Sequence, residues 1–418
     1  MSEGLVFTPF RGLRYDAEHV GSLAAVTCPP YDVLDTPTAV RLAAHPHSVV
    51  RLVLPHTVDP ADPAPHAAAA ARLAAWRRRG VLRTDPTPAF YVYEETEAGR
   101  VHRGVLGALA LPRTGSPVVL PHEATREATV VDRLALLAAT ETDLEPILLI
   151  PDSAGPAFSA VLDAGDAAAP GSRVLAEFRT EDGLGHRLIS VTDPTVTAAV
   201  SGELRSTRAL LADGHHRFEA ARRLHPDGVT LVLLADPATA PRVNPIHRVV
   251  PGLAPAAAAD RAAAAFAVES LPLGDADTCV ERLRGAGETT RAFVVGDTAA
   301  AYLLVGPDPR TLGTTVPPER PPAWRELDVV VAHATLLRAL WGVPDDEDHV
   351  EVSFAAGDAL RRAAQIGGTA VLLNPPPLAA IKAVADSGEL MPRKSTFFTP
   401  KPRTGLVLRP LRDDVGSP

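Results

Sequence analysis

Proline is the residue that most restricts how this chain can fold. The 418 residues include 41 prolines, about twice the usual share of roughly 5%. A proline interrupts a helix or a central strand because it has no N–H group and fixes its own φ angle. We therefore expect short helices and strands separated by fixed turns. Apolar residues make up 46% of the chain, which is enough to bury a core.

The spacing of apolar residues predicts both helices and strands. A β-hairpin is expected around Ala98-Gly99, and residues 22–34 suggest a strand that runs into a turn fixed by two prolines. Further strands are expected at 147–150, 205–212, 291–304 and 369–374. Helices are expected at 66–79, 130–140, 215–225, 254–268, 328–340 and 355–364. This mixture indicates an α+β protein with mixed sheets.

Pro-rich stretches mark the expected boundaries between parts of the chain. The clearest of them lie at 236–256 and 307–323. Four consecutive parts are expected: an N-terminal α/β part at 1–118, a core at 119–250, a helix-plus-strand subdomain at 251–323 and a C-terminal part at 324–418.

Charge and cysteine content exclude several classes of protein. The 41 Lys and Arg residues against 50 Asp and Glu residues leave a net charge of −9, which argues against nucleic-acid binding. Two cysteines cannot build a disulfide framework or a cysteine-based zinc site. The first residues lack the pattern of a signal peptide, and no apolar run is long enough to span a membrane. We therefore expect a cytoplasmic protein.

Lysine is rare, and its distribution excludes two nucleotide-binding motifs. The three lysines, Lys382, Lys394 and Lys401, all lie in the last 37 positions. A Walker A loop needs a lysine after a glycine, and a protein kinase needs one before its catalytic loop. Neither arrangement occurs. G-x-S-x-G and H-E-x-x-H motifs are absent as well.

Residues 210–221, LLADGHHRFEAA, are the most informative segment. An apolar strand ends at Asp213, turns on Gly214 and continues into a helix whose first turn carries two histidines and Arg217. The N–H groups and dipole of a helix N-terminus bind anions, and an arginine adds a planar donor. The segment predicts a phosphate site. The alternative is that Asp213 only caps the helix and the histidines are surface residues.

Two further segments pair an acid with an aromatic ring. The acid Glu123 beside His122 suits a general base or a metal ligand, although Glu123 and Thr125 could simply begin a helix. Tyr31 and Asp32 follow two prolines in a rigid turn, where the alternative is a packed tyrosine and an Asx turn.

Two basic segments in the second half of the chain are candidates for the same site. His247 and Arg248 follow a predicted strand. Residues 391–401, MPRKSTFFTPK, hold two of the three lysines. A lysine kept in an arginine-rich chain suggests a need for a compact ammonium, and two hydroxyls follow Lys394. The alternative is an edge strand with a solvated basic face.

Five motifs occur in order along the chain: CPPYDV, PHEAT…DR, DGHHRFEAA, NPIHR and MPRKSTFFTPK. Together they resemble the bacterial and archaeal family labelled domain of unknown function 1015, from about residue 7 to 408. The PHE motif, the run 145–147 and the DGHHR motif are similar to the core of ParB/sulfiredoxin-like phosphotransferases, notably the ADP-dependent free serine kinases of archaea. The resemblance implies a ParB/sulfiredoxin-like nucleotide-binding core with additional α/β subdomains.

The resemblance also implies roles for individual residues. Glu123 would activate the hydroxyl of serine, and residues 213–217 would hold nucleotide phosphates. The stretch from Ile147 to Asp213 is longer than a compact core needs, which implies an insertion. The cysteine of sulfiredoxin has no counterpart, because His215 or His216 stands in its place, so reduction of cysteine sulfinic acid is not expected.

We therefore expect an enzyme that moves a phosphoryl group between a nucleotide, ATP or ADP with Mg²⁺, and the hydroxyl of a small metabolite, by resemblance L-serine. A phosphatase, a nucleotide-gated binding module and a metal-dependent hydrolase using His122, His215, His216 and His247 remain alternatives. The expected catalytic residues are Glu123, Asp213 and His216. The expected phosphate-binding residues are Gly214, His215, His216, Arg217, Lys394, Ser395 and Thr396. The expected substrate-binding residues are Tyr31, Asp32, His122, His247 and Arg248.

Overall fold

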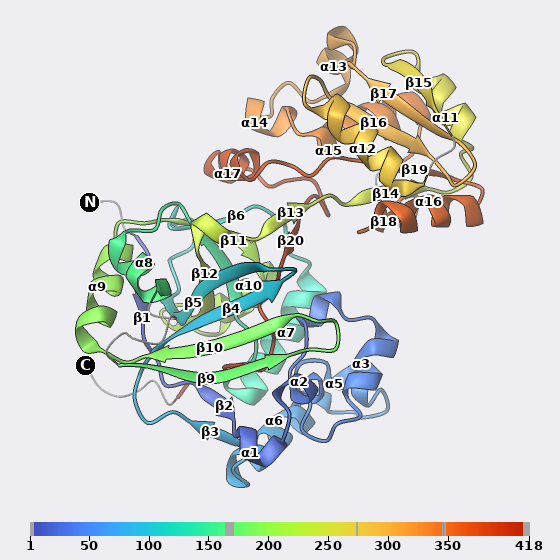
Figure 1. Cartoon of the computed structure of the whole chain (residues 1–418). Helices are drawn as coiled ribbons and strands as arrows, with labels where there is room; N and C mark the ends of the chain where they lie inside the picture. Colours follow the sequence, from blue (N-terminus) through green and yellow to red (C-terminus); the bar gives the residue numbers. More distant parts are fainter. Residues whose placement is uncertain (1–3, 164–170, 273–274, 345, 347, 413–418) are drawn as a thin grey trace. The chain divides into compact units, whose positions relative to one another are not determined.

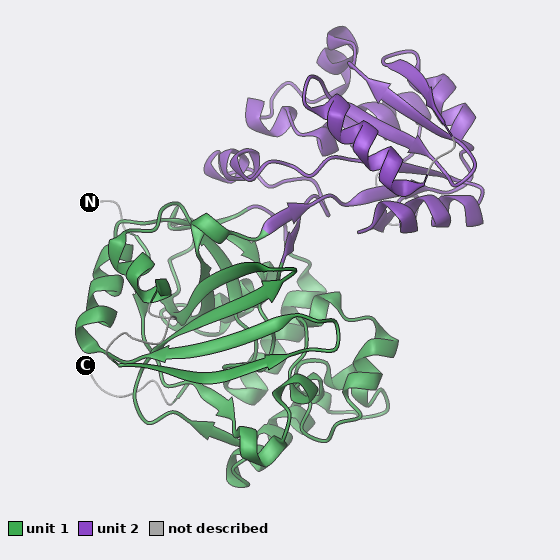
Figure 2. Cartoon of the chain, viewed as in Figure 1, with its two compact units in different colours: residues 1–121, 125–241, 400–418 green, residues 122–124, 242–399 purple. Residues whose placement is uncertain are grey.

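The chain forms two compact units, each built from separated segments (Figure 2). A computed structural model describes residues 4–163, 171–272, 275–344, 346 and 348–412. Unit 1 consists of residues 1–121, 125–241 and 400–418, and unit 2 of residues 122–124 and 242–399. The four expected parts divide the chain into consecutive stretches. Unit 1, in contrast, combines separate segments and includes residues 400–418 at the end of the chain. In the described part of the chain, no helix is both long and apolar enough to cross a bilayer.

A nine-stranded mixed sheet forms the centre of unit 1 (Figure 1). Most neighbours are antiparallel, but β6 and β8 each have one parallel partner, β11 and β12 respectively. Apolar residues from these strands form the main core of the unit. The strands, in spatial order, are β6 (Val119–Pro121), β11 (Ala209–Asp213), β8 (Ile147–Pro151), β12 (Val229–Ala235), β5 (Arg100–Ala110), β4 (Phe90–Glu97), β10 (Gly185–Val191) and β9 (Ser172–Arg179), with β1 (Phe7–Thr8) beside β5.

Short helices surround this sheet, and several carry a proline in their first turn, where no N–H donor is needed. In Figure 1, α7 lies beside α10 and α8 beside α9. The helices of unit 1 are α1 (Ala17–Val20), α2 (Leu23–Val26), α3 (Thr36–Leu42), α4 (Val50–Val53), α5 (Pro55–Val58), α6 (Pro65–Arg78), α7 (Glu127–Thr140), α8 (Pro156–Asp163), α9 (Pro194–Leu204) and α10 (His215–Leu224), with 3-10 turns at Tyr31–Val33 and Pro237–Thr239. Two small ladders pair β2 (Leu13–Tyr15) with β3 (Leu82–Thr84), and β7 (Thr142–Asp143) with β21 (Arg409–Pro410).

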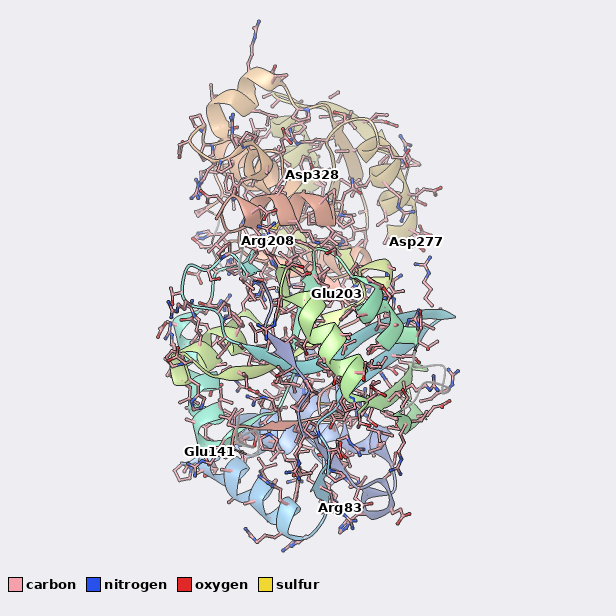
Figure 3. All side chains as sticks on the ribbon, turned by 90° about the vertical axis from the view of Figure 1, so that its left-hand side faces the viewer. Arg83, Glu141, Glu203, Arg208, Asp277 and Asp328 are labelled. Carbon is pink, nitrogen blue, oxygen red and sulfur yellow. The ribbon has the colours of Figure 1, made fainter. Side chains whose placement is uncertain are left out.

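Glu203 joins two of these helices (Figure 3). This residue lies on α9, and its carboxylate accepts hydrogen bonds from the N–H groups of Ala157 and Phe158 at 2.9 and 3.0 Å. The first turn of α8 is thereby capped by another helix. A Cβ at Gly155 would lie 2.2 Å from the Glu203 carboxyl carbon, so this close approach requires glycine.

Unit 2 is built on a six-stranded antiparallel sheet (Figure 1). The apolar faces of α12 and α16 pack against it. Its strands are β15 (Ala267–Leu271), β17 (Ala301–Val305), β16 (Ala292–Gly296), β19 (Thr369–Leu372), β14 (His247–Val250) and β18 (Glu351–Ser353). Its helices are α11 (Pro255–Ala262), α12 (Ala276–Gly287), α13 (Pro309–Thr315), α14 (Pro322–Arg325), α15 (Asp328–Val331), a π-helical continuation over Ala332–Trp341, α16 (Ala356–Gln365) and α17 (Leu378–Asp386). A separate ladder pairs β13 (Arg242–Asn244) with β20 (Phe397–Thr399).

The predicted α+β class with mixed sheets is confirmed, and the hairpin turns at Ala98-Gly99, where both residues have positive φ. The strand predicted over 22–34 is wrong. Residues 23–26 form α2 because the Ser22 hydroxyl accepts the Ala25 N–H and caps a helix. The strand predicted from residue 205 begins only at Ala209, because α9 extends to Leu204.

A buried glutamate in the hairpin should make stability depend on pH. Glu95 is 5% exposed and accepts the Tyr93 hydroxyl at 2.7 Å, and burial raises the pKa of Glu95 to about 7. The nearby His186 does not compensate its charge at neutral pH, because burial lowers the pKa of His186 to about 4. The folded protein therefore holds the proton of Glu95 more tightly than the unfolded chain does. This stabilisation is complete below pH 4.5, the unfolded pKa of Glu95, and it is lost as the pH rises through about 7.

We therefore expect Glu95→Gln to raise the free energy of unfolding at pH 8 by about 1–3 kcal/mol and to change it little at pH 5. Urea unfolding at both pH values measures this difference. Glu97→Gln, two residues further along the strand, is the control. An equal effect of Glu95→Gln at both pH values would show that Glu95 is charged in the folded protein throughout.

Candidate functional site

The turn between β11 and α10 has the predicted strand–glycine–helix form. β11 ends at Asp213, and α10 begins at His215. Between them Gly214 has a φ of +92°, a conformation that residues with a Cβ rarely adopt. A Cβ at this position would also lie 3.1 Å from a guanidinium nitrogen of Arg217. The turn therefore favours glycine, and a side chain here would also press on the arginine beside it.

The Asp213 carboxylate lies between two cations of unit 1. Its Oδ1 is 2.6 Å from Nζ of Lys401, and its Oδ2 is 2.8 Å from Nη2 of Arg217. All three side chains are about 10% exposed. Ion pairs that are this well shielded from water are screened less by salt than surface pairs.

Lys401 connects this carboxylate to a second one. Its Nζ is also 2.5 Å from Oδ2 of Asp32, so a single ammonium bridges Asp32 and Asp213. Burial alone would lower the pKa of Lys401, but the two carboxylates raise it above the usual value. Burial would likewise raise the pKa of Asp32, but Lys401 and Arg217 outweigh it and lower the pKa. Lys401 and Asp32 are therefore charged at neutral pH.

Arg217 is held by the protein through both ends of its guanidinium. Nη1 donates to the carbonyl of Pro146 at 2.6 Å, and Nη2 donates to Asp213. Burial alone would lower the pKa of Arg217, but Glu145 and Asp213 raise it. The Nε atom is buried and has no hydrogen-bond partner among the described residues. Arg217 therefore orients Asp213 and retains one unused donor.

Tyr31 lies against the same group of charges. Its N–H donates to Glu145 at 3.1 Å, and the guanidinium carbon of Arg133 is 4.5 Å from the centre of its ring. The Thr404 hydroxyl donates to the same Glu145 oxygen at 2.9 Å. Burial raises the pKa of Tyr31 to about 12, so the phenol is neutral at physiological pH.

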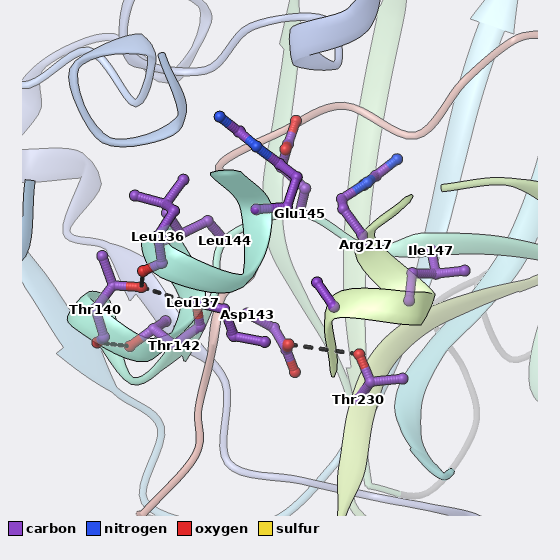
Figure 4. A pocket seen from close by; sticks show the side chains of 12 residues that line it. Leu136, Leu137, Thr140, Thr142, Asp143, Leu144, Glu145, Ile147, Arg217 and Thr230 are labelled. Atoms are coloured by element: carbon purple, nitrogen blue, oxygen red, sulfur yellow. Dashed lines mark hydrogen bonds between the residues drawn. The ribbon is translucent and has the colours of Figure 1, made fainter. Parts of the chain in front are cut away.

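A cavity of about 40 Å³ lies beside these residues (Figure 4). Arg133, Glu145 and Arg217 contribute to its wall. Because one water needs roughly 10–15 Å³ of such space, the cavity has room for a few water molecules and is too small for a metabolite.

The two histidines after Gly214 differ in their surroundings. His215 is 7% exposed. His216 accepts the backbone N–H of Arg126 at its Nε2 atom, at 3.0 Å. When the ring is neutral, this hydrogen bond assigns the proton to Nδ1. It also ties the chain just after the PHEAT motif to the first turn of α10.

Within unit 2, residues 122–124 of the PHEAT motif lie beside the MPRKST motif. His122 Nε2 and the Thr396 hydroxyl share a hydrogen bond of 2.8 Å, and the Met391 N–H donates to the His122 carbonyl at 2.8 Å. The Phe398 ring lies 5.8 Å from that of His122. Glu123, the next residue, also belongs to unit 2.

His247 and Arg248 were expected to contact a substrate, but both lie in the interior of unit 2. They are 3% and 1% exposed. Arg248 donates to His333 Nε2 at 2.9 Å and to the carbonyl of Lys394 at 2.8 Å. Lys394 has a φ of +53°, so Arg248 supports an uncommon backbone conformation. Burial, with a contribution from Arg248, lowers the pKa of His247 to about 4.

Unit 2 also contains a cleft of about 670 Å³, a volume typical of small-molecule sites. Its wall includes Arg291, Asp328, Asn374 and Ser395. Burial raises the pKa of Asp328 (labelled in Figure 3), although the positive charge of Arg291, whose Nε is 3.6 Å from the carboxylate, acts to lower it. Ser395 is thus the one member of the expected phosphate site that lines this cleft.

Residues 7–330 match the family described as "Protein of unknown function (DUF1015)". The chain belongs to this family. No curated protein matches the DUF1015 chain by sequence.

Solved structures overlap with parts of this DUF1015 protein. The structure described as SbnI with C-terminal truncation from Staphylococcus aureus is 11% identical, with a TM-score of 0.38, and the match covers 75% of this chain and 90% of that one. A free serine kinase mutant in complex with ADP is 14% identical, with a TM-score of 0.34 and coverages of 68% and 84%. A conserved hypothetical protein from Pyrococcus furiosus is 13% identical, with a TM-score of 0.34 and coverages of 71% and 94%. TM-scores this low describe only a distant overlap.

The expected site residues of the DUF1015 protein fall into two groups, one in each unit. Four residues that were not among the expected site residues take part in the unit 1 group: Arg133, Glu145, Lys401 and Thr404. The unit 1 group contains Tyr31, Asp32, Asp213, Gly214, His215, His216 and Arg217. The unit 2 group contains His122, Glu123, His247, Arg248, Lys394, Ser395 and Thr396.

Proposed function

We propose that this protein is a phosphotransferase that moves a phosphoryl group between a nucleotide and the hydroxyl of a small metabolite. The observation that carries the proposal is the arrangement at the start of α10, where Lys401 and Arg217 lie on either side of Asp213. The N-terminus of a helix binds anions, and Lys401 and Arg217 offset the negative charge of Asp32 and Asp213 there. Free L-serine is the first candidate acceptor, and this choice rests on the resemblance of the motifs to serine kinases.

Phosphoryl transfer needs positioning and neutralisation of charge more than covalent chemistry. Nucleotide phosphates would lie at the N-terminus of α10, next to Gly214 and His215. Lys401 is a compact ammonium that bridges Asp32 and Asp213, and it would donate to a phosphate oxygen beside them. The carboxylates of Asp32 and Asp213 are the oxygen donors that Mg²⁺ prefers, so they fit this ion. When bound, Mg²⁺ would neutralise phosphate charge.

Glu123 would take the proton from the acceptor hydroxyl as the general base. This role rests on the resemblance of the PHE motif to that of the free serine kinases. Lys394 and Thr396 would add a charge and a hydroxyl for phosphate, while Arg248 would position the turn that carries them.

Phosphorus NMR tests the proposal directly. The protein would be incubated with Mg²⁺, with ATP or ADP, and with L-serine or a pool of other hydroxyl metabolites. The expected result is a new phosphomonoester signal that needs both substrates. Nucleotide loss without any acceptor would identify a hydrolase, and binding without turnover would identify a nucleotide-gated module. A phosphoserine signal that decays to inorganic phosphate would identify a phosphatase.

Replacing Arg217 should weaken nucleotide binding. Arg217→Ala removes the fork that orients Asp213 and the unused Nε donor, so we expect a loss of about 1.5–3 kcal/mol, the value of hydrogen bonds to charged groups. Titration calorimetry with ADP and ATP measures it. Arg222→Ala is the matched control, since Arg222 pairs with Glu219 on the same helix. Unchanged affinity in folded Arg217→Ala would remove Arg217 from the phosphate site.

A further inference from the structure

Two histidines and an aspartate from three helices of unit 1 meet at one point. His56 comes from α5, His66 from α6 and Asp132 from α7. His66 Nε2 is 2.9 Å from Oδ1 of Asp132, and His56 Nε2 is 3.5 Å from the same oxygen. Among the described residues, this is the group of His, Cys, Asp and Glu whose three donor atoms all lie within 4.8 Å of one another.

The separations of these atoms suit a tetrahedral metal ion. Zinc bonds of about 2.0–2.1 Å in a tetrahedron place neighbouring donor atoms about 3.3–3.4 Å apart. The distances of 3.5 and 2.9 Å from the Asp132 oxygen lie on either side of that value. The imidazole rings of His56 and His66 are perpendicular, with centres 5.0 Å apart. Small movements of the side chains would therefore complete the coordination.

The carboxylate is already oriented for this role. Oδ2 of Asp132 accepts from Arg133 Nη2 at 2.5 Å and from Arg133 Nε at 3.0 Å, which leaves Oδ1 facing the two histidines. Arg133 is itself fixed, because Nη1 donates to the carbonyl of Val53 at 2.8 Å. Partners of this kind orient the ligands of metal sites and strengthen binding. The site is also open to water, since the His56 side chain is 59% exposed.

We propose that His56, His66 and Asp132 bind one divalent transition-metal ion, Zn²⁺ in the first place. The ligands are the two Nε2 atoms and Oδ1, and water supplies the fourth position. Imidazole suits zinc and its neighbours in the first transition row, whereas Mg²⁺ prefers oxygen ligands alone. The ion clamps α5 and α6 onto α7. Arg133 contacts both this site and Tyr31, but the metal site has its own ligands and does not depend on phosphotransferase activity.

Metal titration of the untagged, metal-free full chain tests the site. Zn²⁺ binding is followed by calorimetry, and Co²⁺ binding by the visible absorption that tetrahedral Co²⁺ produces. We expect one ion per chain, displacement of Co²⁺ by Zn²⁺, no displacement by excess Mg²⁺, and a higher unfolding temperature with Zn²⁺. A wild-type chain that binds neither ion, or that gives an octahedral Co²⁺ spectrum displaced by Mg²⁺, would overturn the proposal.

Variants identify the ligands. His56→Ala, His66→Ala and Asp132→Asn are each expected to lower Zn²⁺ affinity at least tenfold. The matched control is His349→Ala, because His349 Nδ1 lies 2.6 Å from Oδ1 of Asp346 and no third ligand joins this pair among the residues that the structure describes. Its affinity should equal that of the wild type. His56 is exposed, so its replacement should not disturb folding, and unchanged Zn²⁺ affinity in His56→Ala would overturn the assignment.

Discussion

Glu123→Gln is expected to lower turnover about 10²–10⁴-fold while nucleotide affinity changes little. The substitution keeps the shape of the side chain and removes the group that accepts the hydroxyl proton, and this range is typical of a lost general base. The nucleotide contacts proposed for Gly214, Arg217 and Lys401 are untouched. Steady-state rates with saturating acceptor, together with calorimetric affinity for the nucleotide, separate the two quantities.

Glu127→Gln is the matched control for this experiment. Glu127 lies four residues further along, and its carboxylate accepts from Arg223 at 2.7 and 2.9 Å. The control should turn over at the wild-type rate. Normal turnover in Glu123→Gln would show that Glu123 is not the base, and Asp32 or Asp213 would then be tested in its place.

Local chemistry explains which parts of the site could be predicted from sequence. The turn at Gly214 follows from an apolar run, an acid and a glycine in direct succession, and all of this information lies within twelve residues. The hairpin at Ala98-Gly99 has the same kind of local signal. At 23–26 the apolar run favours a strand, but the Ser22 cap begins a helix, so the cap outweighs the apolar pattern there.

Contacts between residues that are far apart in the sequence explain why other parts of the site could not be predicted. The rarity of lysine drew attention to residues 391–401, but it favoured Lys394, whereas Lys401 is the lysine that bridges Asp32 and Asp213. Lys401 lies 188 positions from Asp213, and their contact depends on the return of the C-terminal segment to unit 1. The polar character of Arg248 suggested a ligand contact, yet its donors satisfy buried carbonyl groups. No local pattern distinguishes these two uses of an arginine.

Replacing Lys401 by methionine should cost about 3–5 kcal/mol of stability at pH 8, the usual effect of removing one partner from a buried ion pair. Methionine keeps most of the length and removes the charge. Because Nζ is 2.5 Å from one carboxylate and 2.6 Å from the other, the two facing oxygens lie within about 5 Å of each other (2.5 + 2.6). Two such carboxylates repel, and one of them should take up a proton more readily.

The pH dependence of this loss distinguishes repulsion from a simple packing defect. In the wild type, the lowered pKa of Asp32 contributes stability above its unfolded value, which is lost as the pH falls through the folded value. In Lys401→Met, a raised carboxylate pKa gives the opposite trend. The difference between the two proteins in urea unfolding should therefore shrink from pH 8 to pH 5. Lys401→Met/Asp32→Asn should recover much of the loss, and Lys382→Met should cost little. A loss that is equal at both pH values and persists in the double variant would mean that Lys401 only fills space.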